Sequence, residues 1–167
     1  MEGSFEQTCY EQVCDFHDQF GLDHPKAPQL DVFDNKPGLI KFRVDLIEEE
    51  FRELKDAIKD KDFVEVIDAL ADLLYVINGF GASIGVDMDV AHDLVHKSNM
   101  SKLCVSEEEA QQTVNWYVEQ YKEGKQPYDT PAYRLSTNGK YYVVYNQSSG
   151  KILKSINYSV VDLTSLA

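Results

Sequence analysis

The 167-residue chain lacks a surplus of basic residues. It holds 16 Lys and Arg against 29 Asp and Glu, so its formal net charge is -13 at pH 7. Nucleic acids and anionic membrane surfaces are bound by clustered Lys and Arg, and the sequence concentrates none. We therefore expect no nucleic-acid partner and no membrane partner. A phosphorylated small molecule stays compatible with this charge, because bound metal ions invert the charge locally.

The chain also lacks a long apolar run and a cysteine framework. Residues 1–20 have neither a basic start nor an apolar stretch, so we expect no secretory leader, and no segment reaches the length of a membrane span. The three cysteines, Cys9, Cys14 and Cys104, are odd in number and have no framework spacing. This is typical of free thiols in a reducing compartment. We expect a cytoplasmic protein whose cysteines are small buried or half-buried residues.

Five helices are predicted from the spacing of apolar residues and from capping residues. The first begins at Ser4, where Gln7 completes a capping box, and ends near Gly21; Asp87 or Asp89 caps the fourth. The expected ranges are 4–21, 39–59, 63–84, 87–102 and 106–123, with a Pro-rich loop over 22–38. The third helix is apolar nearly all round, which is typical of a central, buried helix.

The composition of the C-terminal residues differs from that of the helical part of the chain. Lys140–Tyr145 and Lys151–Tyr158 are rich in Tyr, Val and Ile, and Asn146–Gly150 separates them, which predicts a β-hairpin. A lone hairpin is marginal in water, so we expect it to pack on the helices or on a partner subunit. The predicted fold class is all-α, a helical bundle of four to five helices with a small C-terminal β-hairpin. We expect a helical domain over 1–125, then a linker and the hairpin over 126–167.

Glutamates gather on one side of the second predicted helix. At about 100° per residue, Glu49, Glu50 and Glu53 share an arc that borders the apolar seam. Glu48 falls on the other flank of the seam, so we exclude it from the candidate site. A solvated acidic face explains Glu48 equally well.

Carboxylates on the third predicted helix are the sharper signal. Glu65, Asp68 and Asp72 share a narrow arc of a helix that is otherwise apolar. An ionised buried carboxylate is unfavourable unless it is paired or bound to metal, and the nearby basic residues are too few to pair all of these acids. A solvated face again accounts for Glu65. A hard divalent cation with oxygen ligands resolves the conflict for the remaining acids. The expected ligands are Glu49, Glu50, Glu53, Asp68 and Asp72.

The order of these carboxylates follows a known pattern. Glu49-Glu50-Phe51-Arg52-Glu53 spells Glu-Glu-x-x-Glu, and Asp72 lies on the next helix. The chain thereby resembles the all-α NTP pyrophosphohydrolases, which include MazG-like proteins, dimeric dUTPases, dCTP pyrophosphatases and phosphoribosyl-ATP pyrophosphatase. That family continues with Glu-x-x-Asp, whereas here Ala69 stands at the glutamate position and Asp68 is its nearest substitute. Glu65-Val66-Ile67-Asp68 also spells this second half, but one turn early.

The resemblance extends over residues 10–103. Matching features are Phe16-His17, Phe20-Gly21, Arg43, Asp68-Ala69-Leu70-Ala71-Asp72, Tyr75, Gly79 and the stretch Val95-His96-Lys97-Ser98-Asn99-Met100-Ser101-Lys102. Together they resemble phosphoribosyl-ATP-pyrophosphatase-like proteins of the MazG superfamily. Residues 104–167 gain little from the resemblance.

The resemblance implies an enzyme, a hydrolase acting on acid anhydrides. Its substrate would be a nucleoside triphosphate, cleaved between the α- and β-phosphates to give a nucleoside monophosphate and pyrophosphate, as in cleaning of the nucleotide pool. The five carboxylates would hold Mg²⁺, or Mn²⁺ in its place, and Glu50 is the expected general base. Family sites are commonly completed across subunits, so we expect a homodimer or homotetramer.

Substrate contacts are expected outside the carboxylates. Asn99 and Lys102 lie three residues apart on the fourth predicted helix and are expected to bind phosphate or sugar, together with His96. Arg43 either reaches phosphate or pairs with a carboxylate. Tyr75 either contacts the base or packs in the core.

Other functions fit the sequence less well. His92-Asp93-Leu94-Val95-His96 has the histidine spacing of a zinc metalloprotease helix, but Asp replaces the catalytic Glu and no third ligand follows. A non-catalytic acidic bundle, acting as a binding or scaffold protein, is favoured by Ala69. A phosphoribosyl-ATP pyrophosphatase is the second enzymatic alternative. The preferred base and sugar depend on pocket shape, on which no motif reports.

Overall fold

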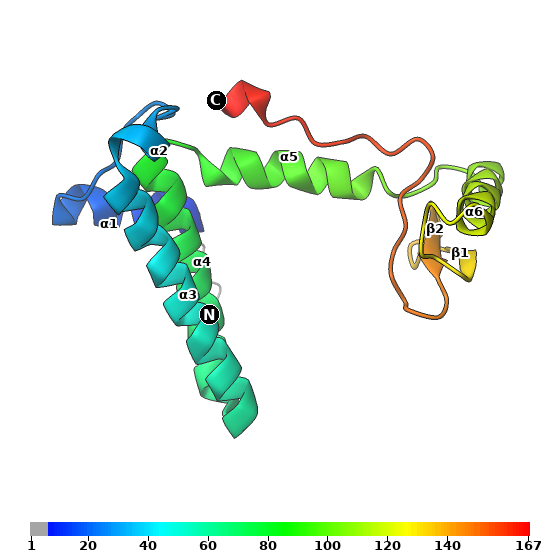
Figure 1. The fold of residues 1–167 in the computed structure, drawn as a ribbon, viewed down its shortest axis with the longest axis horizontal. Helices are drawn as coiled ribbons and strands as arrows, with labels where there is room; N and C mark the ends of the chain where they lie inside the picture. The colour runs from blue at the N-terminus through cyan, green and yellow to red at the C-terminus, as the bar shows by residue number, and fades with distance from the viewer. Residues whose placement is uncertain (1–6) are drawn as a thin grey trace. The chain divides into compact units, whose positions relative to one another are not determined.

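The computed structural model describes residues 7–167, which divide into two compact units (Figure 1). The first unit contains residues up to 92 together with 163–167, and the second contains 93–162. Over these residues the chain is 58% helical, in six α-helices, with a small two-stranded antiparallel hairpin, which confirms the predicted fold class. The domain boundary expected at residues 125 and 126 stays a prediction.

The first unit is built on an antiparallel pair of long helices. α3 (Pro37–Asp60) and α4 (Phe63–Ile84) run side by side in Figure 1 and pack along their length. Their turn is tight because Lys61 adopts a left-handed conformation, with φ 58°, and the Asp62 side chain caps α4. Asp62 accepts hydrogen bonds from the backbone N–H of Val64, at 3.0 Å, and of Glu65, at 3.2 Å. α4 occupies the predicted range.

Three shorter helices complete the first unit and lead out of it. These are α1 (Cys9–Phe20), which packs on α4, the single turn α2 (Val32–Asn35), which the sequence did not predict, and α5 (Met88–Met100), which continues into the second unit. The predicted start of α1 at Ser4 lies outside the described residues. Thr8 caps this helix, and its side chain forms a capping box with Glu11.

The second unit is a small helix-on-hairpin structure. α6 (Glu107–Lys122) packs on β1 (Pro131–Leu135) and β2 (Tyr142–Asn146), which pair antiparallel. The core between them contains Cys104, Ala110, Tyr117, Val144 and Leu153. The 3₁₀ turn at Thr164–Leu166 follows this unit in the chain and belongs to the first unit. The hairpin is thus covered by a helix, one of the two arrangements expected for it.

The predicted pairing of the hairpin is wrong. Residues 151–158 do not form its second strand; within them only Ile152 makes an isolated bridge to Tyr145. The strands are joined instead through Asn138-Gly139, where Gly139 has φ 69°. An Asn-Gly pair is a strong hairpin signal because both residues tolerate positive φ. Pro131 fits the first strand because it lies at the strand's beginning, where a missing N–H is tolerated.

The prediction that the third helix would be buried on all sides is wrong for the single chain. α4 buries small residues such as Ala69, Gly79 and Ala82. Five of its large apolar side chains are exposed: Phe63, Ile67, Leu70, Leu74 and Ile77 have exposed fractions of 76, 53, 52, 49 and 40%. These five residues recur at alternating steps of four and three, which is a helix-packing seam. We call this set the α4 seam.

The three cysteines differ in how far they are exposed to solvent. All three are free, as expected, and Cys14 is half-buried and Cys104 buried, but Cys9 is exposed, so the expectation of a buried or half-buried residue is wrong for Cys9. Among residues 7–167, no single helix is long and apolar enough to cross a membrane. α4 and α5 reach the required length and apolar character only when the two helices are counted together, and they are separated by a bend of 112°.

Candidate active site

Acidic side chains from α3 and α4 meet around Glu50. Its carboxylate is half-buried, and its Oε2 atom is buried without a hydrogen-bond partner. Desolvation raises the pKa of Glu50, and the surrounding negative charges raise it further. Those charges belong, in decreasing order of effect, to Asp72, Glu53, Glu49 and Asp68. The structure therefore places the five predicted carboxylates in one electrostatic neighbourhood.

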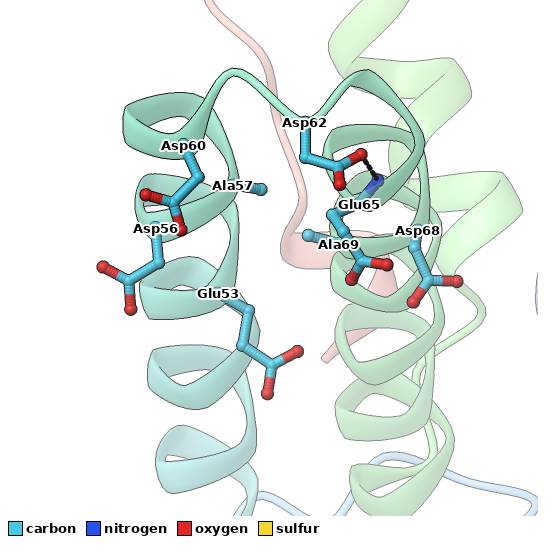
Figure 2. Close-up of a pocket in the computed structure, with 8 residues that line it drawn as sticks. All are labelled: Glu53, Asp56, Ala57, Asp60, Asp62, Glu65, Asp68 and Ala69. Atoms are coloured by element: carbon cyan, nitrogen blue, oxygen red, sulfur yellow. Dashed lines mark hydrogen bonds between the residues drawn. The ribbon is translucent and has the colours of Figure 1, made fainter.

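An acidic cavity of about 280 Å³ continues this cluster toward the α3–α4 turn. Its lining is Glu53, Asp56, Ala57, Asp60, Asp62, Glu65, Asp68 and Ala69 (Figure 2). No Lys or Arg lines it. Figure 2 shows the Glu53 side chain pointing toward α4, while Asp56 and Asp60 turn away from α4. The cavity thus shares two residues, Glu53 and Asp68, with the predicted set of metal ligands.

Sequence reasoning left Asp56, Asp60 and Asp62 out of the site. A signal for the first two existed, because Glu53, Asp56 and Asp60 are spaced at i, i+3 and i+7 and so share a face of α3. Asp62 is already used as the cap of α4. Glu65, which the sequence left ambiguous, also lines the cavity.

Ala69 lies at the contact between the two helices. It is 3% exposed, and Figure 2 shows it opposite Ala57 of α3, which is 8% exposed. Two facing alanines let the helices approach closely. A glutamate at position 69 would place its side chain in this contact, so the departure from the family pattern matches the local packing. Asp68, one residue earlier, projects a carboxylate beside the cavity instead.

The donor set is chemically suited to a hard divalent cation. It consists of carboxylate oxygens, one of which, Oε2 of Glu50, is buried and unpaired. Across residues 7–167, no three His, Cys, Asp or Glu side chains are already gathered closely enough to hold a metal ion. The residues therefore fit a cation by the chemistry of their oxygen atoms and by their shared position around Glu50.

Arg43 lies in the interior of the first unit. It is 6% exposed, and its Nη2 donates to Nε2 of His17 at 3.2 Å. Nδ1 of His17 donates to the carbonyl oxygen of Asp23 at 2.8 Å. Burial lowers the pKa of His17, and the Arg43 cation lowers it further. His17 is thus a neutral structural residue, and the substrate role of Arg43 stays a prediction.

Tyr75 lines a separate cavity of about 200 Å³ between α1 and α4, with Asn78 and Leu74. Its ring is 40% exposed and meets Phe16 edge-on at a centroid distance of 5.8 Å. Both roles left open for Tyr75, contact with the base and packing in the core, stay predictions.

The predicted phosphate-binding residues belong to the second unit. Lys102 donates from Nζ to Oδ1 of Asn99 at 2.8 Å, and His96 is exposed on α5. The carboxylates belong to the first unit. A joint role of these residues with the acidic cluster stays a prediction.

A pair of antiparallel helices that carries facing carboxylates is the core expected of the MazG-like NTP pyrophosphohydrolases. A family model described as phosphoribosyl-ATP pyrophosphohydrolase matches residues 13–99, just over half of the chain. The chain belongs to this family, which is part of the MazG-like superfamily. Membership points to a pyrophosphohydrolase, a hydrolase that acts on acid anhydrides.

A viral protein resembles the chain beyond the family match. The chain is 27% identical to the uncharacterized protein L479 of Acanthamoeba polyphaga mimivirus. The alignment covers 98% of this chain and 97% of that protein. The similarity therefore includes the residues of the second unit that lie after residue 99.

Proposed function

We propose that this protein is a divalent-cation-dependent nucleoside triphosphate pyrophosphohydrolase. It cleaves the bond between the α- and β-phosphates and releases a nucleoside monophosphate and pyrophosphate. The observation that carries the proposal is the half-buried Glu50, whose Oε2 lacks a partner among four further carboxylates. An arrangement of this kind repels itself unless cations enter it.

The five carboxylates supply both the cation ligands and the general base, and Glu50 serves in both roles. Glu49, Glu50, Glu53, Asp68 and Asp72 would hold Mg²⁺, or Mn²⁺. The chemistry that a bound cation supplies is neutralisation of the polyphosphate and acidification of a water. Glu50 accepts the proton of the water that attacks the α-phosphorus, since its raised pKa brings it closer to neutral pH than an ordinary glutamate. The cavity beside Tyr75 and Asn78 receives the base.

The active form of the protein is a homodimer or homotetramer. The α4 seam leaves five large apolar side chains exposed on one helix, and such a seam is stable in water when a second helix covers it. A second copy of this chain supplies a matching seam, because a two-fold interface pairs the same surface with itself. The substrate in this proposal is a free nucleotide, and neither nucleic acid nor membrane takes part in the reaction.

A phosphoribosyl-ATP pyrophosphatase is the second candidate function. The description of the matching family favours it. Both candidates share the α–β cleavage and the carboxylates, so they differ only in the nucleoside part of the substrate.

The test is pyrophosphate release from a panel of nucleoside triphosphates, deoxynucleoside triphosphates and phosphoribosyl-ATP, with Mg²⁺, Mn²⁺ or EDTA. We expect cation-dependent release from at least one nucleotide, reduced at least about 100-fold in Glu50→Gln. Glu48→Gln is the matched control, because it makes the same change on the other flank of α3, and it should retain activity. Turnover of phosphoribosyl-ATP alone would select the second candidate.

The opposing hypothesis is a non-catalytic acidic bundle. It predicts no pyrophosphate release from any nucleotide, and a rise in thermal stability for Glu50→Gln that added Mg²⁺ does not change. A Mg²⁺-induced stabilisation of the unmodified protein that Glu50→Gln removes would contradict it.

A further inference from the structure

Two cavities in the second unit adjoin each other through shared lining residues. The larger has a volume of about 520 Å³ and the smaller about 270 Å³, and they share Tyr117, Gln126 and Lys154. The larger adds Trp116, Ile156 and Tyr158, and the smaller adds Lys102, Tyr128 and Lys151. Neither is lined by Asp or Glu. We call this surface the aromatic–lysine groove, and its larger part falls within the volume range of about 300–1,000 Å³ that ligand pockets occupy.

Aromatic rings that contact one another line the groove. Tyr117 is 5% exposed, and its hydroxyl accepts a hydrogen bond from the backbone N–H of Lys154 at 3.1 Å. Trp116 meets Tyr117 edge-on at 4.8 Å between centroids, and Tyr128 meets it from another side at 5.7 Å. Trp116 nevertheless remains 43% exposed. A half-exposed indole held by a buried ring offers a preformed surface on which a flat ligand stacks.

The walls of the groove carry cations. Nζ of Lys154 lies 4.3 Å from the ring centroid of Tyr158, and Nζ of Lys151 lies 5.2 Å from that of Tyr128. The ammonium group of Lys102 contacts the amide of Asn99. Each of these three lysines contacts an uncharged ring or amide. Its positive charge therefore stays available to an anionic ligand.

The charge of the second unit permits an anionic ligand. Residues 93–162 contain eight Lys or Arg and eight Asp or Glu, whereas the rest of the chain contains eight and 21. The whole net charge of -13 therefore lies in the first unit. The groove lies in a unit whose formal net charge is zero, so the unit as a whole does not repel an anion.

We propose that the aromatic–lysine groove of the second unit binds a nucleotide. The base stacks on Trp116, Gln126 contacts the edge of the base, and the phosphate lies against Lys151 and Lys154. An apolar ligand would leave the lysines unused, and a simple anion would leave the indole unused, so a flat ring that carries a phosphate matches both. A single exposed Trp suits one base better than a strand of several stacked bases. The proposal uses none of the carboxylates and does not depend on hydrolysis.

The chain provides its own reporter for the test. Trp116 is the only tryptophan of the sequence. We would titrate the protein with AMP, GMP, CMP and UMP in EDTA and follow its tryptophan fluorescence. At least one mononucleotide should quench the fluorescence saturably, while ribose 5-phosphate, which lacks the base, should not.

Matched lysine variants test the phosphate contacts. Lys151→Gln and Lys154→Gln should each weaken binding by about tenfold. Lys140→Gln removes the same charge from the hairpin turn, outside the groove, and should bind as the unmodified protein does. Glu50→Gln should abolish pyrophosphate release and leave the quenching unchanged, so failure of one proposal is distinguishable from failure of the other.

Three outcomes would overturn the proposal. The first is the absence of saturable quenching up to about 1 mM of every mononucleotide. The second is equal affinity of the Lys151→Gln, Lys154→Gln and Lys140→Gln variants. The third is binding of a single-stranded oligonucleotide of about ten bases much more tightly than any mononucleotide, which would make the groove a nucleic-acid site.

Discussion

At the scale of single residues, the unusual position is Ala69. Its burial against Ala57 keeps α3 and α4 close together, and the family's carboxylate is absent from that position. Asp68 lies one residue earlier, lines the acidic cavity and raises the pKa of Glu50. The structure thus offers one carboxylate to take over the missing ligand.

Replacement of Asp68 tests this substitution. We expect Asp68→Asn to lose most of the Mg²⁺-induced rise in melting temperature, as Asp72→Asn does, because each removes one ligand charge. Glu65→Gln is the control on the same helix, and it should keep most of that rise. Equal Mg²⁺ responses of Asp68→Asn and the unmodified protein would show that Asp68 is not a ligand.

His17 gives the first unit a predictable dependence on pH. Its pKa is lowered in the folded state by burial and by Arg43. The unfolded chain takes up a proton below pH about 6.5, while the folded chain resists protonation down to the lowered pKa. Folding free energy is therefore lost as pH falls through this window, by up to about 1.4 kcal/mol per pH unit.

Urea denaturation at pH 7.5 and 5.5 measures this effect. His17→Gln keeps an acceptor for Arg43 and removes the titration, so it should lose less stability between the two pH values than the unmodified protein. At pH 7.5 the variant should already be less stable, by roughly 1 kcal/mol, because the hydrogen bond to Asp23 is lost. Parallel pH profiles would contradict the assignment of His17 as a buried neutral residue.

At the scale of elements, local signals predicted most of the helices. α4 matched because Asp62 and Gly85 mark its ends, and α6 because Ser106 caps its start and accepts from the N–H of Glu109. α2 was missed because four residues are too few to show a period. The hairpin was misassigned because the prediction relied on runs rich in Tyr, Val and Ile and did not use the turn signal of Asn138-Gly139.

The candidate site was also predictable in part from the sequence. Helical period alone selected the carboxylates that surround Glu50, since both helices are regular across them. The hydrogen bond between Arg43 and His17 was not predictable, because it depends on how α1 and α3 are both packed on α4, which no local pattern encodes. The exposure of the α4 seam was also missed, because a sequence cannot tell burial within a chain from burial between chains.

The C-terminal end of α4 depends on a close backbone contact. Gly85 has φ 75°, and a Cβ atom there would lie 2.1 Å from the carbonyl oxygen of Ala27. Gly21 ends α1 with a similar φ of 68° and has open space around it. We expect Gly21→Ala to cost about 1 kcal/mol of folding free energy, and Gly85→Ala roughly 3 kcal/mol or more, because the loop must also move. Equal losses in chemical denaturation would contradict the contact.

At the scale of the whole molecule, the α4 seam makes assembly testable. We expect a dimer or tetramer by light scattering, and a shift toward the monomer for Leu70→Glu, which places a charge in the centre of the seam. Leu30→Glu is the control, because Leu30 is 69% exposed and lies in the loop before α2. An unchanged mass for Leu70→Glu would exclude the seam as the interface.

The position of the single tryptophan has a consequence for how unfolding is observed. Trp116 lies in the second unit, whereas most of the helical residues lie in the first. Tryptophan emission therefore follows the loss of one unit, and far-ultraviolet circular dichroism chiefly follows the loss of the other. If the two units unfold independently, the two signals give different transition midpoints, and a single two-state fit would misstate the stability of both.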